Sequence, residues 1–221
     1  MTSQITLDGP RVAPGAGGAP RSLVILLHGY GSNGDDLISL APYWRDSLPH
    51  TAFVSPNAPE ICPGAPGGFQ WWGITSLEPN ARAAGAARAA PVLDAFIDQE
   101  LARAELTESS VALVGFSQGT MMALHNGLQR RRALAGIVGY SGMLADATVL
   151  ASATQRPPIL LIHGDSDPMI PVSAFHHAKA ALSAAQFDVE CHVSPGLAHS
   201  IDMAGLQLGG AFLRRVLASA G

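Results

Sequence analysis

Short apolar segments that alternate with longer stretches rich in alanine and leucine constrain the fold of this chain most. Five of these segments are SLVILLH (22–28), TAFVSP (51–56), SVALVGF (110–116), LAGIVGYSG (134–142) and PILLIHGD (158–165). Nearly unbroken apolar runs of this length are typical of strands covered on both faces, as in a parallel sheet. A sixth segment, FDVECHV (187–193), alternates more, and we expect a strand nearer the sheet edge there.

The stretches between these segments carry apolar residues at helical spacing. Helices are predicted over 81–106, 119–132, 171–185 and 202–219. Pro91 falls inside the first of these and is expected to start a new helix or to kink one. Because strands and helices alternate, the sequence predicts an α/β fold with a mostly parallel sheet and helices on both faces. Ligands bind such a sheet at the carboxyl ends of its strands.

Length and composition are those of one globular domain spanning 1–221. The apolar fraction of 48% is enough for a sizeable core, and the charged fraction of 14% is wrong for a disordered chain. The net charge is −4, and the largest basic cluster, Arg130 to Arg132, is expected to cap a helix end. Nucleic acid is therefore not an expected partner.

Nothing in the sequence predicts secretion or membrane insertion. The N-terminus lacks the pattern of a signal peptide, and no apolar run approaches the roughly 18 residues of a membrane span. Cys62 and Cys191 lie far apart in sequence and form no metal-type pair, so free thiols in a cytoplasmic protein are expected. Residues 1–20, rich in glycine and proline, are expected to hold a short strand or a loose hairpin.

Residues 57–79, NAPEICPGAPGGFQWWGITSLEP, differ from the rest of the chain. Four prolines and four glycines predict a long loop without periodicity of its own. Loops of this length inside a compact domain are usually functional or mobile. Two compatible interpretations remain, a wall of a binding site and a surface loop held by tryptophans that pack on the core.

The pentapeptide Gly115-Phe116-Ser117-Gln118-Gly119 matches the G-x-S-x-G nucleophile elbow. In such an elbow the serine has a strained backbone between a strand and a helix, and the glycines relieve the crowding around it. The following helix directs its first N–H groups toward the serine hydroxyl. The pentapeptide alone is weak evidence, but here an apolar strand precedes it and a helical pattern follows it, as the elbow requires.

A serine hydroxyl needs a base to remove its proton, and the base needs an acid to orient it. Downstream of Ser117, ILLIHGDSDPMIP carries Asp165 and Asp167 in a turn after a strand, and SPGLAHS carries His199 in a loop before the last helix. We expect Asp167 to be the acid and His199 the base, whereas Asp165 is expected to bond turn amides. The other histidines are expected to be structural or solvent-facing: His28, His163, His125, His176, His177 and His192. Of these, His28 and His163 could border the site.

An oxyanion site is expected in the early segment LLHGYGSNGDDL, which bends at Gly29 and Gly31 after a strand. Oxyanion holes in this fold take one backbone N–H from such a loop and one from the residue after the nucleophile, here Tyr30 and Gln118. A glycine-rich turn without function is the alternative. A phosphate-binding loop is disfavoured because no G-K-[ST] follows and no fitting acidic residue lies on a second strand.

With these elements placed, the chain resembles the phospholipase/carboxylesterase family of α/β-hydrolases, the group with acyl-protein thioesterases and small bacterial carboxylesterases. The resemblance starts at about Ser22 and rests on LHGYG, GFSQG, HGDSDPMIP and GLAHS. It implies a triad and two oxyanion donors: Ser117, Asp167 and His199, with Tyr30 and Gln118. No metal or organic cofactor is expected. The family tends to place an acidic residue after its paired aromatics, and this chain departs from that pattern at Gly73.

The site is expected to be open, because 142–157 is too short to hold a large inserted cap domain. Its predicted substrate-binding wall consists of Phe69, Trp71, Trp72, Met169, Ile170 and Leu197. A shallow apolar groove suits short- to medium-chain esters, so the predicted function is a serine carboxylesterase that acts through an acyl-enzyme.

Alternative functions remain open at this point. Within the family they are an acyl-thioesterase or a lysophospholipase, with an acylated protein or a lysophospholipid as partner. Outside the family they are a non-catalytic binding protein of the same fold, and another serine enzyme such as a peptidase or an acyltransferase. The oligomeric state, a homodimer among the choices, is also open.

Overall fold

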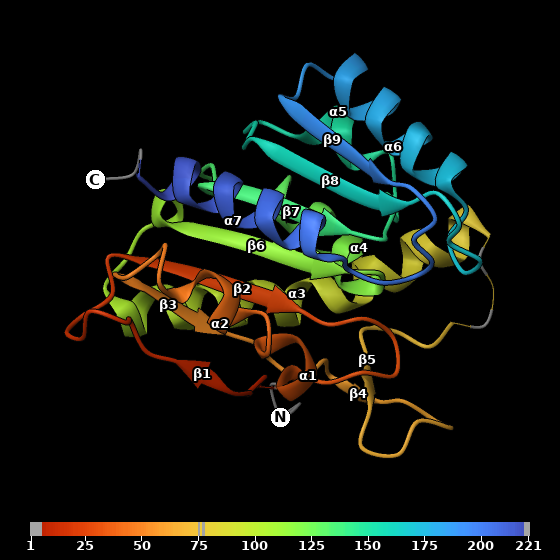
Figure 1. The fold of residues 1–221 in the computed structure, drawn as a ribbon. Helices are drawn as coiled ribbons and strands as arrows, with labels where there is room; N and C mark the ends of the chain where they lie inside the picture. The colour runs from red at the N-terminus through yellow and green to blue at the C-terminus, as the bar shows by residue number, and fades with distance from the viewer. Residues whose placement is uncertain (1–5, 75, 77, 219–221) are drawn as a thin grey trace.

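The structure is a computed structural model that describes residues 6–74, 76 and 78–218 (Figure 1). Three predicted segments extend outside this range. The parts concerned are residues 1–5 of the N-terminal segment, residues 75 and 77 of the 57–79 loop, and residue 219 of the last predicted helix. In the described part a seven-stranded sheet runs through the molecule in the order β1-β3-β2-β6-β7-β8-β9. Its strands are β1 (Arg11–Val12), β2 (Ser22–Leu27), β3 (Thr51–Val54), β6 (Val111–Phe116), β7 (Gly136–Tyr140), β8 (Ile159–Gly164) and β9 (Val189–Ser194). All six predicted strands are present.

The sheet is parallel except at one edge, where β1 pairs antiparallel with β3. The N-terminal segment thus supplies an edge strand to the main sheet. Consecutive residues of β2 enter opposite cores because side chains of a strand alternate between its faces. Leu23, Ile25 and Leu27 belong to one apolar cluster, and Val24 and Leu26 belong to the other.

Helices cover both faces of the sheet (Figure 1). One core contains residues of α3 (Pro79–Ala104), α4 (Gln118–Gly127) and α6 (Val172–Ala184). The opposite core contains residues of α1 (Gly34–Ile38), α2 (Ala41–Arg45) and α7 (Met203–Ala218). A short helix α5 (Val149–Ser152) and a 3₁₀ turn η1 (Glu108–Ser110) complete the described helical elements. The predicted α/β class, a mostly parallel sheet between two helical layers, is confirmed.

Two details differ from the sequence-based expectation. The helix α3 continues through Pro91 rather than starting anew there, and Ala89, Leu93 and Phe96 around it are buried in the core. The other alternative, a kink at Pro91, stays a prediction. The basic cluster does not cap a helix end through Arg130. Its guanidinium instead bonds three carboxylates at 2.5–3.4 Å: Asp94 and Asp98 of α3, and Glu108.

The strand order places a potential site at one position of the sheet. From β2 the chain proceeds outward to β3, whereas β6 to β9 follow one another in the opposite direction. The order therefore reverses between β2 and β6, and the loops after these two strands diverge to opposite faces. Open α/β sheets bind their ligands in the crevice at such a switch point. None of the helices in the described residues is long and apolar enough to cross a membrane.

Candidate active site

The turn between β6 and α4 carries Ser117 in a strained conformation. Its backbone has φ 54° and ψ −114°, a region that residues other than glycine rarely occupy. The Ser117 N–H donates to the carbonyl oxygen of Tyr140 in β7 over 2.9 Å, so the neighbouring strand holds the turn in place. Strain of this kind, fixed by surrounding contacts, is the geometry of a nucleophile elbow.

Both glycines of the elbow are required by close approach of the backbone. A Cβ atom at Gly119 would lie 1.7 Å from the carbonyl oxygen of Leu27 in β2. A Cβ atom at Gly115 would lie 2.4 Å from the backbone nitrogen of Thr120 in α4. Only glycine lets the first turn of α4 pack this tightly on the ends of β2 and β6, and this packing sets where Ser117 stands.

Asp167 and His199 meet although 31 residues separate them in sequence. His199 Nδ1 lies 2.7 Å from Asp167 Oδ2, and the backbone N–H groups of Met169 and Ile170 donate to Asp167 Oδ1 over 2.8 and 2.9 Å. Burial, the largest single influence, would raise the pKa of Asp167. The hydrogen bonds from Ile170, His199 and Met169 together outweigh it and hold the pKa below its usual value.

The ionised Asp167 decides the tautomer of His199. A carboxylate only accepts hydrogen bonds, so His199 Nδ1 carries the proton and Nε2 is left as the basic atom. The His199 ring packs on Phe116, the residue before Ser117, with ring centroids 4.9 Å apart, and its side chain stays 20% exposed. Asp165 bonds the Gly196 N–H at 2.7 Å, as predicted for a residue that bonds turn amides, and thereby ties the acid loop to the histidine loop.

The expected oxyanion donors lie on the two loops that flank Ser117. A Cβ atom at Gly29 would lie 3.3 Å from Ser117 Cβ, so the loop after β2 runs directly against the elbow. Gln118 is the first residue of α4, where N–H groups have no intrahelical acceptor. Within the described residues, neither the Tyr30 N–H nor the Gln118 N–H donates to a protein acceptor. Both N–H groups are therefore available to an oxygen of a substrate.

The predicted substrate wall is only partly at the surface. The side chains of Trp71 and Trp72 are 1% and 3% exposed, and Ile170 is 5% exposed, so these three contribute to the core and do not line an open groove. The Trp71 indole N–H donates to the His28 carbonyl oxygen over 3.0 Å, which helps to hold its loop inward. The remaining members of the predicted wall are accessible: Met169 is exposed, and Phe69 and Leu197 are half-buried.

The 57–79 segment is more regular than its composition indicates. Two short strands, β4 (Glu60–Ile61) and β5 (Phe69–Gln70), pair as an antiparallel hairpin. Phe69 at the end of this hairpin also pairs with Ser32 of the loop after β2. The interpretation as a loop held by tryptophans packed on the core is observed, and the compatible one, a wall of a binding site, stays a prediction.

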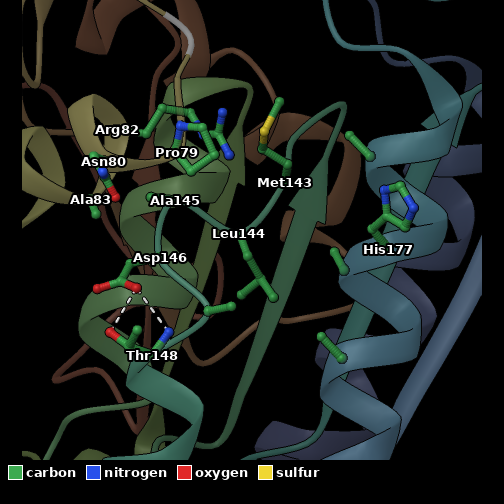
Figure 2. Close-up of a pocket in the computed structure, with 14 residues that line it drawn as sticks. Pro79, Asn80, Arg82, Ala83, Met143, Leu144, Ala145, Asp146, Thr148 and His177 are labelled. Atoms are coloured by element: carbon green, nitrogen blue, oxygen red, sulfur yellow. Dashed lines mark hydrogen bonds between the residues drawn. The ribbon is translucent and has the colours of Figure 1, made fainter.

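A cavity of about 410 Å³ lies where the start of α3, the loop after β7 and α6 approach one another (Figure 2). Met143 and Leu144 lie at its upper and central parts, and Asp146 and His177 contribute polar groups. None of the six predicted wall residues borders this cavity. Ser117, Asp167 and His199 do not line this cavity either, and the sequence did not predict it.

Two buried histidines bond the backbone of loops next to the candidate site. His28 Nδ1 pairs with the Gly29 carbonyl, His28 Nε2 accepts from the Ala58 N–H, and burial lowers the pKa of this ring. His163 Nε2 lies 2.8 Å from the Ile170 carbonyl and 3.4 Å from Asp167 Oδ2, so its N–H steadies the acid loop. Both histidines have the packing and backbone-bonding role that the sequence favoured over a place in the site.

No cluster of three or more histidine, cysteine, aspartate or glutamate side chains that could hold a metal ion occurs among the described residues. Cys62 and Cys191 are both free thiols, as predicted.

A parallel sheet with a strained serine after one strand and a hydrogen-bonded aspartate–histidine pair after later strands defines the α/β-hydrolase class. The sequence pattern of the phospholipase/carboxylesterase family matches residues 8–217, and the chain belongs to this family of ester hydrolases. The resemblance inferred from the four motifs is confirmed.

Individual relatives agree with this assignment. The chain is 34% identical over 194 residues to acyl-protein thioesterase 1 of Schizosaccharomyces pombe, and the aligned region covers 83% of this chain and 85% of the relative. It is 27% identical over 187 residues to the esterase YpfH of Escherichia coli, and the aligned region covers 85% of this chain and 79% of the relative. The crystal structure of esterase PE8 superimposes with a TM-score of 0.92 at 44% identity, covering 96% of this chain and all of that one.

Proposed function

We propose that this protein is a serine carboxylesterase that hydrolyses short- to medium-chain carboxylic esters through an acyl-enzyme. The observation that carries the proposal is the 2.7 Å contact between His199 Nδ1 and a buried Asp167, at the sheet edge where Ser117 has its strained backbone. This arrangement leaves a basic nitrogen on the side of the imidazole away from the carboxylate. It supports Ser117 as nucleophile, His199 as general base and Asp167 as the residue that orients the base.

In the proposed mechanism His199 Nε2 removes the Ser117 hydroxyl proton while the oxygen attacks the ester carbonyl carbon. The N–H groups of Tyr30 and Gln118 stabilise the oxyanion of the tetrahedral intermediate. The imidazolium returns its proton to the leaving alcohol, and the acyl group stays on Ser117. Water, deprotonated by the same nitrogen, then attacks the acyl-enzyme and releases the acid.

The substrate class is proposed from the surroundings of Ser117. Phe69, Met169 and Leu197 are accessible apolar side chains on loops of this edge. The cavity of about 410 Å³ beside Met143 and Leu144 has no residue of the proposed triad in its lining. It adjoins the loop after β7, where a Cβ atom at Gly142 would lie 3.0 Å from the Ser117 carbonyl oxygen. This space supports an acyl group of limited length. The similarity to an acyl-protein thioesterase supports acyl thioesters as a second substrate class, with an acylated protein as partner. A lysophospholipid substrate, a cytoplasmic location and a homodimer stay predictions.

The proposal is tested by a substrate panel on the wild type and on Ser117→Ala. We expect p-nitrophenyl esters from acetate to octanoate to be cleaved with a preference for the shorter half, and Ser117→Ala to lose at least about 10³-fold in kcat. A fluorophosphonate probe should label the wild type only. The control is Ser109→Ala, which removes an exposed hydroxyl in η1 that pairs with Thr107 and should leave turnover intact.

Other results would point to the alternative functions. An unlabelled Ser117 without turnover would indicate a non-catalytic binding protein. Amide turnover equal to ester turnover would indicate a peptidase. Faster cleavage of acyl thioesters than of the matched oxygen esters would place the thioesterase first.

A further inference from the structure

The side chain of Gln118 has no role in the proposed reaction, which uses only its backbone N–H. It is nevertheless 1% exposed and makes two hydrogen bonds to one short segment. Gln118 Oε1 accepts from the Trp71 N–H over 3.0 Å, and Gln118 Nε2 donates to the Trp72 carbonyl oxygen over 2.9 Å. The amide thus bonds this backbone with one acceptor and one donor, as a neighbouring strand would.

The segment that Gln118 holds is bonded at its other end to the loop with Tyr30. The Phe69 N–H donates to the Ser32 carbonyl over 2.7 Å, and the Gly31 N–H donates to the Phe69 carbonyl over 2.9 Å. On the other side of Tyr30, the Trp71 indole N–H donates to the His28 carbonyl over 3.0 Å. Residues 69–72 therefore contact the Tyr30 loop both before and after Tyr30.

We propose that the Gln118 side chain is a positioning residue, which fixes through residues 69–72 the separation between the two oxyanion N–H groups. The inference rests on the proposed function, because it concerns the donors of that same site. The backbone of Gln118 carries one donor. Its side chain holds residues 69–72, and these residues bond the loop that carries the other donor, Tyr30.

The loop with Tyr30 receives little support from its own side chains. Gly31 has φ 77°, a conformation without side-chain packing to lock it, and Tyr30 itself is 41% exposed. Oxyanion donors act only when they are fixed near 3 Å from the developing charge, and misplacement by about 1 Å costs on the order of 10²-fold in rate. A brace between the two donors is therefore expected to act on kcat more than on KM.

The test compares Gln118→Met and Gln118→Glu with the wild-type full-length chain, using p-nitrophenyl acetate. Methionine has a similar length, cannot make either hydrogen bond and keeps the backbone N–H. We expect Gln118→Met to lose about 10- to 100-fold in kcat with KM changed less than about threefold. The inhibition constant of a trifluoromethyl ketone, which forms an oxyanion on Ser117, should rise by the same factor as kcat/KM falls.

Gln118→Glu supplies a readout that a merely structural role would not move. A protonated carboxyl group has one donor and one acceptor and can replace the amide, whereas an ionised one repels the Trp72 carbonyl oxygen. Burial favours the protonated form as pH falls. The ratio of the kcat of this variant to that of the wild type at the same pH should therefore rise from pH 8 to pH 6.

The matched control is Gln129→Met, the same substitution just past the other end of α4, where the exposed Gln129 side chain bonds the His125 carbonyl. It should keep the wild-type kcat and inhibition constant. A folded Gln118→Met variant with wild-type kcat would overturn the positioning role. So would a flat kcat ratio in Gln118→Glu combined with unchanged affinity for the ketone. Failure of the proposed function looks different, because then the wild type itself neither turns over the ester nor binds the ketone.

Discussion

At the scale of single residues, each group of the proposed site is held by contacts that do not involve its proposed reactive atom. Ser117 is held by a backbone bond to Tyr140, so its side chain takes no part in holding the turn. Asp167 receives two backbone N–H groups on one oxygen and His199 on the other. The carboxylate is thus ionised and immobile, and the imidazole is oriented by it.

Asp167→Asn tests this orientation. The amide oxygen can still accept from the Met169 and Ile170 N–H groups, but its NH₂ then faces His199 Nδ1 and favours the tautomer with the proton on Nε2. We expect kcat to fall by about 10³- to 10⁴-fold, as for a triad whose histidine has the wrong tautomer. Steady-state kinetics with a p-nitrophenyl ester measure the loss.

The matched control for this variant is Asp165→Asn, two residues earlier in the same turn. Its oxygen bonds the Gly196 N–H and not the imidazole, so kcat should fall less than about tenfold. Equal losses in both variants would mean that the turn as a whole matters and that Asp167 does not orient the base.

At the scale of elements, loops at the carboxyl ends of the strands are joined to one another by bonds that the strands alone do not supply. The hairpin of β4 and β5 pairs with the loop after β2, and the acid loop is tied to the histidine loop. The edge strand β1 is also joined to a distant element by a side-chain bond. Arg11 of β1 bonds the Glu100 carboxylate of α3 over 2.8 Å, and the side chain of Glu100 is 5% exposed.

The tie between β1 and α3 predicts a stability effect. Among the described residues, Arg11→Met leaves the buried Glu100 with Arg103, at 3.3 Å, as its ion-pair partner. It also removes the exposed contacts of Arg11 with Asp8 and the Gly9 carbonyl. A buried carboxylate that loses a partner is costly, and we expect the free energy of unfolding to fall by about 2 kcal/mol. Urea denaturation followed by circular dichroism measures it. Arg103→Met is the control, since this side chain is 63% exposed and its removal should cost less than about 0.5 kcal/mol. The idea fails if the two variants are equally destabilised.

At the scale of the whole molecule, the dependence of stability on pH follows from buried ionisable groups. Burial lowers the pKa of His125, and the charges of Asp146 and Asp94 offset only part of this effect. Burial likewise lowers the pKa of His28. Both rings therefore take up a proton less readily in the folded protein than in the unfolded chain.

The folded state should therefore lose stability as pH falls below about 6.5, the ordinary pKa of histidine, until the lowered pKa values are reached. Each such ring contributes up to about 1.4 kcal/mol per pH unit in that window. The lowered pKa of Asp167 adds a second loss, which begins only below its ordinary value of 3.8. Urea midpoints measured from pH 7.5 to 4.5 give the histidine part of the profile.

A histidine variant separates one contribution from the rest of this profile. His125→Leu should flatten the decline between pH 6.5 and pH 5, because the buried ring that must charge on unfolding is gone. His50→Leu, at an exposed position, should leave the slope unchanged. An unaltered slope in His125→Leu would mean that the loss comes from other groups.

The sequence by itself determined what depends on local pattern. Runs such as SLVILLH predict a buried strand because both faces must be apolar, and G-x-S-x-G between a strand and a helix predicts the elbow because its glycines allow the close approach seen at Gly119. Ser117, Asp167 and His199 follow β6, β8 and β9, and this places all three at one edge, because the carboxyl ends of parallel strands share that edge.

Only the tertiary structure decided what depends on contacts between distant segments. That Trp71 packs inward follows from acceptors on His28 and Gln118, and the Trp72 carbonyl oxygen accepts from the Gln118 amide; no local pattern of 57–79 contains these partners. The same holds for the bonds of Arg130 to three carboxylates and for the cavity beside Met143. Both depend on helices that meet only in the folded chain. A side chain's burial depends on which neighbours reach it, and those neighbours are fixed by the packing of the whole molecule.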